Sequence, residues 1–187
     1  MVEHAIHLIT KKPIQCKYRS KTPAENDWID EQVKIMLENG VIEEANSSYS
    51  SNVVVVGKKD GEGKGMDRLC INLAPLNKVT IPDKYPLPNI DEMLTNFYGA
   101  NIFTTLDLAA AYWQIMLRDK DKAKTVFLTR NGQYQFRVMP FGLNNAPATF
   151  QKLINKILQK YLYKFCIVYL DDIIIYSRNV KEHRKHV

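Results

Sequence analysis

Two adjacent carboxylates, Asp171 and Asp172, lie between two stretches that are otherwise apolar and β-branched. Ile, Val and Tyr fit a pleated, half-buried surface, so residues 165–177 predict a hairpin with the aspartates at its tip. Asp is common in tight turns, and an ordinary turn is one interpretation. The other is half of a divalent-metal site for phosphoryl transfer, because Mg²⁺ prefers carboxylate oxygens.

A third carboxylate, Asp107, stands at the end of a predicted strand, residues 102–108. It could cap the segment 109–113 that follows. It could also meet Asp171 and Asp172 if the two strands are neighbours in one sheet. Three carboxylates on rigid elements suit a pair of Mg²⁺ ions, or Mn²⁺ in their place, one activating a 3′-hydroxyl and one steadying a triphosphate leaving group. Such catalysis rests on positioning and charge neutralisation and requires no nucleophilic Ser or Cys.

The N-terminal half of the sequence predicts an extended segment, a helix and a basic hairpin. Residues 1–21 show no helical period and are expected to run extended. Thr22 and Glu25 have the spacing of a capping box, so a helix is expected from there to Gly40. Residues 52–59 and 68–73 predict two strands around a glycine-rich turn. The turn does not match a phosphate-loop fingerprint, because no helix follows it.

The C-terminal half alternates strands and helices irregularly. Asn89 is expected to start a helix that stops at Gly99, and residues 147–161 predict an amphipathic helix. Asn131-Gly132 is a strong hairpin signal between two short apolar stretches. Irregular alternation with hairpins predicts an α+β fold with a mainly antiparallel sheet. Such a sheet would give the three aspartates a place to meet.

Composition narrows the function classes. The chain has 187 residues, with 26 Lys and Arg against 20 Asp and Glu, and a formal net charge of +6. One domain with a real core is expected, and the charge is compatible with a polyanionic partner without proving one.

The 3 cysteines are far apart, which argues against a disulfide framework or a zinc knuckle and favours a reduced, intracellular setting. No apolar run reaches the ~18 residues of a membrane span, so no membrane partner is expected. His183 and His186 are interpreted as part of an exposed helix face.

Four ordered motifs resemble those of reverse transcriptases. Tyr169-Leu170-Asp171-Asp172 is similar to their Y-x-D-D motif, and Phe103–Leu108 with Tyr112–Ile115 resembles the strand that carries their first catalytic aspartate. Met139–Gln151 and Leu76–Pro88 resemble blocks of gypsy-type long-terminal-repeat retrotransposons and related pararetroviruses. The resemblance covers nearly the whole chain.

The resemblance implies the fingers and palm of a right-hand polymerase, an α+β fold whose antiparallel palm sheet is backed by helices and which lacks a thumb. Residues 1–21 would be an extended N-terminal segment, about 22–88 mainly fingers and about 89–187 mainly palm. The implied activity is that of an RNA-directed DNA polymerase, a nucleotidyltransferase of a retrotransposon Pol polyprotein. Such an enzyme extends a primer on an RNA or DNA template with deoxynucleoside triphosphates and uses Mg²⁺.

The same resemblance implies catalytic and metal-binding roles. Asp107, Asp171 and Asp172 would carry the metals, and the main-chain carbonyl of Leu108 could add a ligand beside the nucleotide. Tyr112 would lie under the sugar of the incoming deoxynucleotide and exclude a 2′-hydroxyl by its bulk. A core aromatic is the alternative for Tyr112.

Further residues would bind the nucleotide or the primer and template. Lys58 and Arg68 match residues that hold the triphosphate, a role that suits the forked guanidinium of Arg, although both could be plain surface charges. Phe141 and Gly142 would pack near the nucleotide, with Gly142 allowing close backbone approach, unless they form an ordinary strand-to-helix connection. Tyr169 would contact the primer end or the template base, or would be a cross-strand aromatic.

The sequence also departs from the family pattern. Asn72-Leu73-Ala74 stands where relatives read Asp-Tyr-Arg, residues 60–67 make a longer turn, and Ala109-Ala110-Ala111 replaces a polar-Gly approach to Tyr112. The chain ends soon after the aspartate hairpin, so an incomplete palm and no thumb, connection or ribonuclease H region are expected. Phosphate contacts supply much of the affinity for nucleic acid, so a polymerase without a thumb should hold primer and template weakly. The alternative function is therefore a catalytically inactive, truncated nucleic-acid-binding remnant.

Overall fold

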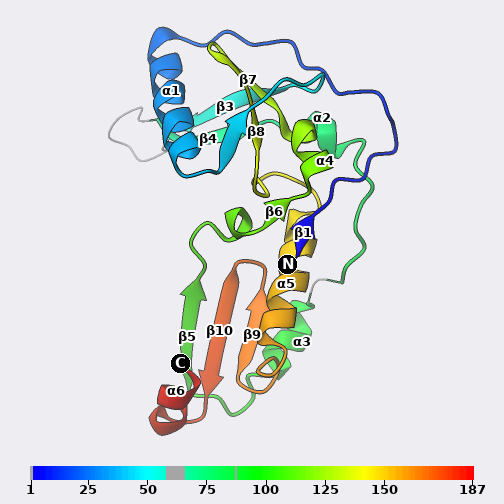
Figure 1. Ribbon diagram of the computed structural model, residues 1–187. Helices are drawn as coiled ribbons and strands as arrows, with labels where there is room; N and C mark the ends of the chain where they lie inside the picture. The colour runs from blue at the N-terminus through cyan, green and yellow to red at the C-terminus, as the bar shows by residue number, and fades with distance from the viewer. Residues whose placement is uncertain (1, 58–65, 87) are drawn as a thin grey trace. The chain divides into compact units, whose positions relative to one another are not determined.

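The computed structural model describes residues 2–57, 66–86 and 88–187 (Figure 1). The chain folds into two compact units, each made of two separate stretches. The first unit comprises Met1–Pro82 and Tyr112–Ala146, and the second comprises Asp83–Ala111 and Pro147–Val187. Residues 112–146 thus group with the N-terminal stretch, while the assignment of residues to fingers or palm stays a prediction.

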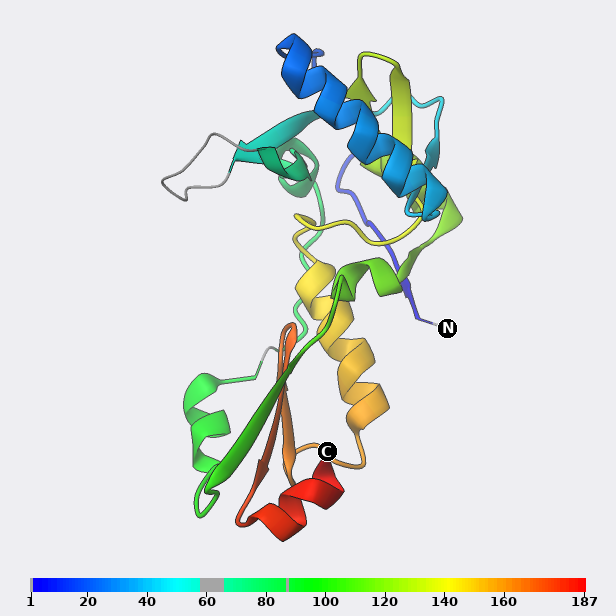
Figure 2. The same ribbon diagram turned by 90° about the vertical axis from the view of Figure 1, so that its left-hand side faces the viewer.

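The first unit is built on a five-stranded sheet with the order β2-β8-β7-β3-β4. Neighbours pair antiparallel except β3 and β7, which are parallel. A long helix, α1, runs across this part of the chain (Figure 2). The strands are β2 (Ile42–Glu44), β3 (Ser51–Gly57), β4 (Met66–Ile71), β7 (Phe127–Thr129) and β8 (Gly132–Phe136).

Helix α1 (Pro23–Glu38) begins and ends where the sequence predicts. The Thr22 hydroxyl accepts the backbone N–H of Glu25 at 3.3 Å, and the Glu25 carboxylate accepts the Thr22 N–H at 2.8 Å, which completes the capping box. Ile29, Val33 and Met36 form its buried stripe. Gly40 follows with φ of +66°, a conformation that favours glycine.

Short elements complete the first unit. Strand β1 (Glu3–His4) pairs in parallel with β6 (Met116–Leu117). The buried Asp121 accepts the backbone N–H of Ile6 at 3.1 Å and pairs with Lys124, whose ammonium donates to the Ile6 carbonyl, so an ion pair anchors the N-terminal strand. The remaining helices are α2 (Ala74–Asn77), η1 (Ala111–Gln114, whose first residue belongs to the second unit), α4 (Asp119–Lys122) and η2 (Ala123–Thr125).

The β7–β8 hairpin is confirmed, but its turn lies one position earlier than predicted. Thr129 pairs with Gly132, so Arg130 and Asn131 form the turn and Gly132 opens β8. Gly132 has φ of +148°, which explains why glycine is useful there. The guanidinium of Arg130 binds both Asp27 and Asp30 of α1, at 2.8 and 2.6 Å, and these contacts attach the turn to the helix.

The second unit is a three-stranded antiparallel sheet with the order β5-β10-β9. Its strands are β5 (Ile102–Asp107), β9 (Cys166–Tyr169) and β10 (Asp172–Ser177). Helices cover both faces, as Figure 2 shows for α3 (Ile90–Thr95) and α5 (Ala146–Leu158). On the α3 face, Met93, Ile167 and Tyr176 form a buried cluster. The expected antiparallel sheet backed by helices is confirmed.

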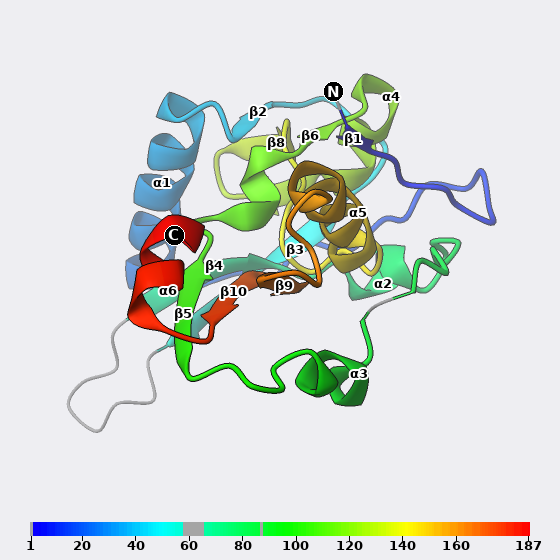
Figure 3. The same cartoon turned by 90° about the horizontal axis from the view of Figure 1, so that it is seen from below.

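Helix α6 (Val180–His186) lies beside β5 and β10 (Figure 3) and is attached by its histidines. The ring nitrogens Nδ1 of His183 and His186 both lie within hydrogen-bond distance of the buried Ser177 hydroxyl, at 2.9 and 2.8 Å. The His186 ring also stacks on Phe165 at 4.0 Å. The interpretation of these histidines as an exposed helix face was wrong, because both contact the sheet. Within the described residues, no helix is both long and apolar enough to cross a membrane.

Candidate active site

The sheet of the second unit places two of the three predicted aspartates directly opposite each other. Asp172, the first residue of β10, pairs with Asp107, the last residue of β5. Residues opposite each other in an antiparallel pair project to the same face with Cβ atoms ~4.5–5.5 Å apart. Asp107 therefore belongs to a strand end rather than to a helix cap, and the expected convergence is confirmed for this pair.

Asp171 occupies the turn between β9 and β10, next to this pair. Tyr169 pairs with Asp172, so Leu170 and Asp171 form a two-residue turn. Leu170 has φ of +53°, whereas Asp171 is not among the described non-glycine residues with positive φ. Positive φ at the first position alone is the pattern of a type II′ turn, which normally has glycine there. A leucine in this conformation carries backbone strain on the order of 1–3 kcal/mol, so the surrounding structure must hold it.

The side chain of Gln151, fully buried on α5, holds the turn. Its carbonyl oxygen accepts the Leu170 N–H at 3.0 Å, and its amide nitrogen donates to the Val168 carbonyl at 3.2 Å and to Asn155 at 2.9 Å. One amide thus satisfies the N–H of the strained residue and the carbonyl of the residue two positions before it. Gln151 fixes the hairpin that carries Asp171 and Asp172.

Asp171 is in an environment that disfavours its negative charge. Burial raises the pKa of the Asp171 carboxyl, and repulsion from Asp107 and then from Asp172 raises it further. Its Oδ1 atom is buried and has no hydrogen-bond partner among the described residues. A buried carboxylate oxygen without a donor is unfavourable unless a proton or a cation compensates it.

The donor chemistry of these residues fits a divalent cation. Carboxylate oxygens are preferred by Mg²⁺ and Mn²⁺, and a cation would relieve both the repulsion and the unpaired Oδ1. As the side chains stand, no three His, Cys, Asp or Glu residues of the described chain form a group that could hold an ion. Asp107, Asp171 and Asp172 would hold it, and Leu108, which directly follows Asp107, offers only its main-chain carbonyl.

Tyr169 pairs with Asp172 across the hairpin and is partly buried against the cluster of Met93, Ile167 and Tyr176. Its packing matches a cross-strand aromatic. Contact with a primer or a template stays a prediction for this residue.

The first unit brings together several residues predicted to bind the nucleotide. The Tyr112 ring is buried and lies 5.1 Å from the ring of Phe141, which is 51% exposed. Trp113 also contacts Phe141, at 6.1 Å between ring centres, and its indole N–H is buried without a partner in the described structure. Tyr112 is therefore a packed aromatic beside an exposed one.

Gly142 follows Phe141 in a loop that Asn77 holds. The Asn77 amide donates to the Gly142 carbonyl at 2.7 Å, and its oxygen accepts the Asn144 N–H at 3.0 Å. Gly142 has φ of +89°, and a Cβ there would meet its nearest described neighbour, the Ile71 carbonyl, only at 4.0 Å. The backbone conformation, rather than crowding within the chain, explains this glycine.

Arg68 is exposed on β4, opposite Val56 of β3. The same strand contributes Cys70 and Ile71 to a small pocket of about 130 Å³, which Trp113, Phe141 and Gly142 also line. Lys58 and the glycine-rich turn after it lie outside the described residues.

Sequence reasoning assigned no role to Gln151 or Asn77, although each fixes a loop that carries predicted site residues. A signal for Gln151 exists, because it is a polar residue among the apolar positions of an amphipathic helix. A buried polar side chain needs partners, and here the partners are the backbone groups of the hairpin.

Comparison with known proteins shows what the chain is similar to. The family model for reverse transcriptase (RNA-dependent DNA polymerase) matches residues 56–187. The chain is 43% identical, over 97% of its length, to the retrovirus-related Pol polyprotein from transposon 297 of Drosophila melanogaster, and 38% identical, over 100%, to that from transposon gypsy. A solved foamy viral protease-reverse transcriptase in complex with an RNA/DNA hybrid has the same fold, with a TM-score of 0.81 at 21% identity, covering 97% of this chain and 25% of that one.

The chain spans only part of these relatives, 17% of the transposon 297 polyprotein and 18% of the gypsy polyprotein. The family match nevertheless includes all three aspartates, the Tyr112 region and the loop of Gly142. The chain belongs to the reverse transcriptase family.

Proposed function

We propose that the chain carries the catalytic centre of an RNA-directed DNA polymerase, which adds deoxynucleotides to a primer 3′-hydroxyl with two divalent metal ions. The observation that supports this most is the pairing of Asp107 with Asp172 beside a turn that holds Asp171. Three carboxylates from two strand ends and a tight turn suit a two-metal site better than an ordinary hairpin tip.

Each group of residues has a role in this proposal. Asp107, Asp171 and Asp172 hold Mg²⁺, or Mn²⁺ in its place, with the Leu108 carbonyl as a further ligand. When bound, the ions neutralise the charge that develops as the primer hydroxyl attacks the triphosphate. Gln151 positions the two hairpin aspartates, and Asp171 must be deprotonated to act as a ligand.

In the first unit, we assign the incoming deoxynucleotide to Tyr112, Phe141, Gly142 and Arg68, with Lys58 as a further phosphate contact. The ring of Tyr112 excludes a ribonucleotide by its bulk, and the Arg68 guanidinium binds phosphate oxygens through its fork of N–H donors. Tyr169 contacts the primer end or the template base. The nucleic-acid partner is an RNA or DNA template with its primer, and the RNA/DNA hybrid bound by the foamy viral relative supports this choice.

The proposal is tested by primer extension on an RNA template with Mg²⁺ or Mn²⁺. Wild type is compared with Asp171→Asn and with Asp119→Asn, an exposed aspartate on α4. Extension should fall at least ~100-fold in Asp171→Asn, more than is typical for loss of a residue that only supports a metal ligand. It should stay within about twofold in Asp119→Asn, because that side chain makes only a surface ion pair.

Equal extension by wild type and Asp171→Asn would overturn the metal-site assignment. Binding of primer and template by wild type without any extension, in either metal, would favour a non-catalytic nucleic-acid-binding role.

A further inference from the structure

The N-terminal segment 11–21, here called the basic strap, concentrates the positive charge of the chain. It contains Lys11, Lys12, Lys17, Arg19 and Lys21, and no acidic residue occurs between Glu3 and Glu25. These side chains supply five positive charges to a chain whose net charge is +6. The remainder of the chain is therefore nearly neutral, and the strap is a localised electrostatic feature.

The strap backbone is held in place by two side chains next to it in the first unit. The Ser50 hydroxyl accepts the Cys16 N–H at 2.9 Å and donates to the Cys16 carbonyl at 3.1 Å. The buried Asn52 amide accepts the Arg19 N–H at 3.1 Å and donates to the Lys17 carbonyl at 2.9 Å. Together with the parallel bridge between Gln15 and Ser50, these bonds fix residues 15–19 of the strap in an extended form.

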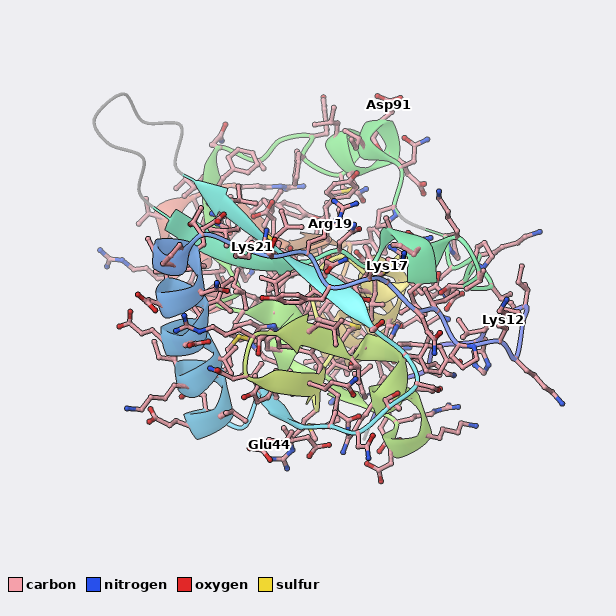
Figure 4. The ribbon with its side chains drawn as sticks, turned by 90° about the horizontal axis from the view of Figure 1, so that it is seen from above. Lys12, Lys17, Arg19, Lys21, Glu44 and Asp91 are labelled. Carbon is pink, nitrogen blue, oxygen red and sulfur yellow. The ribbon has the colours of Figure 1, made fainter. Side chains whose placement is uncertain are left out.

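This attachment leaves most of the charged residues exposed, with Lys21 partly exposed. Figure 4 shows Lys12, Lys17, Arg19 and Lys21 spread along the segment, and none of them forms a salt bridge within the described part of the chain. Lys17, Arg19 and Lys21 occupy every second position, so the Cα atoms of successive members are ~6.6 Å apart in an extended backbone. Tyr18, between two of them, is 44% exposed.

We propose that the basic strap is a binding site for single-stranded nucleic acid, distinct from the aspartate site. A line of cations at two-residue spacing matches the repeat of phosphates along an extended strand, and the exposed tyrosine offers a face on which a base stacks. Membrane-surface binders typically use an amphipathic helix, whereas the strap is extended and has no helix. Its backbone hydrogen bonds to Ser50 and Asn52 reduce the ordering that binding requires.

This site does not depend on the proposed polymerase activity. It lies in the first unit, whereas all three aspartates belong to the second. The strap should therefore bind nucleic acid in Asp171→Asn as well as it does in wild type, and a failure of one proposal is distinguishable from a failure of the other.

The test measures binding of a fluorescein-labelled single-stranded RNA to the full chain by anisotropy, at salt concentrations from 50 to 200 mM. The variant Lys17→Gln/Arg19→Gln removes two charges without touching a buried side chain. If both contact phosphates, the slope of log K against log salt becomes shallower by ~1.4, and affinity falls ~25-fold at 0.1 M salt, because each phosphate contact on a single strand contributes ~0.7 to the slope.

The matched control is Lys34→Gln/Lys120→Gln, two exposed lysines of the same unit outside the strap. It should leave both slope and affinity nearly unchanged. Asn52→Ala keeps every charge but removes the side chain that holds the strap backbone. It should bind RNA more weakly than wild type, and circular dichroism checks that the variant is folded.

Equal losses in strap and control variants, or an unchanged salt slope in Lys17→Gln/Arg19→Gln, would overturn the proposal. Binding of vesicles that contain phosphatidylserine, with the same dependence on Lys17 and Arg19 and tighter than RNA binding, would assign the strap to a lipid surface instead.

Discussion

At the scale of single residues, Asp171 combines burial, two neighbouring like charges and a buried oxygen that has no hydrogen-bond partner among the described residues. Burial and the neighbouring aspartates raise the pKa of its carboxyl, so the folded state favours the protonated form. The stability that this group contributes is present below its ordinary pKa and is lost as pH rises through the raised pKa of the folded state. The carboxylate destabilises the fold at neutral pH unless a cation is bound.

Asp171→Asn should therefore raise the melting temperature at pH 7, with a smaller gain near pH 4. The reason is that asparagine keeps the shape without the repelled charge. Thermal unfolding followed by circular dichroism across this pH range measures the difference. Asp119→Asn is the control and should lower the melting temperature at pH 7, because contact with Lys122 lowers the pKa of the Asp119 carboxyl and so favours its charged form. A gain for Asp171→Asn that is independent of pH would contradict the assigned cause.

Millimolar Mn²⁺ should reverse the order of the melting temperatures of wild type and Asp171→Asn, since a ligand that binds only the folded state stabilises it. Wild type should gain melting temperature with Mn²⁺, and Asp171→Asn should gain less.

Gln151→Met should destabilise the second unit by about 1–3 kcal/mol. The change nearly conserves volume but leaves the Leu170 N–H without its partner and removes a donor from Val168. The Mn²⁺ response should also weaken, because the turn loses its support. Lys152→Met is the neighbouring control, with a half-exposed ion pair to Asp83, and should stay within about 1 kcal/mol. Chemical denaturation of both variants provides the comparison.

At the scale of elements, local signals predicted starts and types better than ends. The capping box of α1 was confirmed in full, whereas α3 and α5 end at Thr95 and Leu158, before the predicted Gly99 and 161. The β7–β8 turn moved by one residue because Gly132 joins the ladder. A helix N-cap is determined by a few adjacent residues, whereas the C-terminal end of a helix depends on what the helix packs against.

In the candidate site too, features set by adjacent residues were predictable and features set by tertiary contacts were not. The turn at Asp171 was predictable from its flanking residues, but the register that sets Asp172 against Asp107 depends on pairing between distant strands. The family resemblance, not local pattern, indicated that pairing. The support of the turn by Gln151 was missed because it is a contact between a helix and a hairpin.

Ala110 is held in a backbone conformation that L-residues other than glycine rarely adopt. Its φ is +49°. An L-residue in this left-handed region costs about 1–2 kcal/mol, so Ala110→Gly should stabilise the chain by about 1 kcal/mol. Ala109→Gly, the adjacent control without positive φ, should destabilise by about 0.5–1 kcal/mol. Denaturant midpoints distinguish the two, and matching signs would contradict the strain assigned to Ala110.

At the scale of the whole molecule, each unit is assembled from two stretches of sequence. In the first unit, β2 pairs with β8 and β3 with β7, and both partners come from residues 112–146. Residues 1–82 contain the basic strap and α1 but only part of their own sheet. Cutting the chain at residue 82 therefore does not isolate a complete unit.

Residues 1–82 produced alone should remain unfolded, with poorly dispersed amide signals in NMR. The same residues joined by a flexible Gly/Ser linker to 112–146 should give a dispersed spectrum, because β7 and β8 are restored. A folded spectrum from residues 1–82 alone would show that the pairings with β7 and β8 are dispensable.

The strand order β5-β10-β9 also sets when the aspartates can meet during synthesis. Asp107 leaves the ribosome well before Asp172, its partner across the ladder, has been added. At ~5–20 residues per second, the intervening chain takes several seconds to make. A nascent polypeptide released in that interval would carry Asp107 but none of its partners. The three aspartates therefore come together only after Asp172 has been added, whereas the residues of the basic strap are made earlier, so the binding proposed for the strap precedes assembly of the aspartate site.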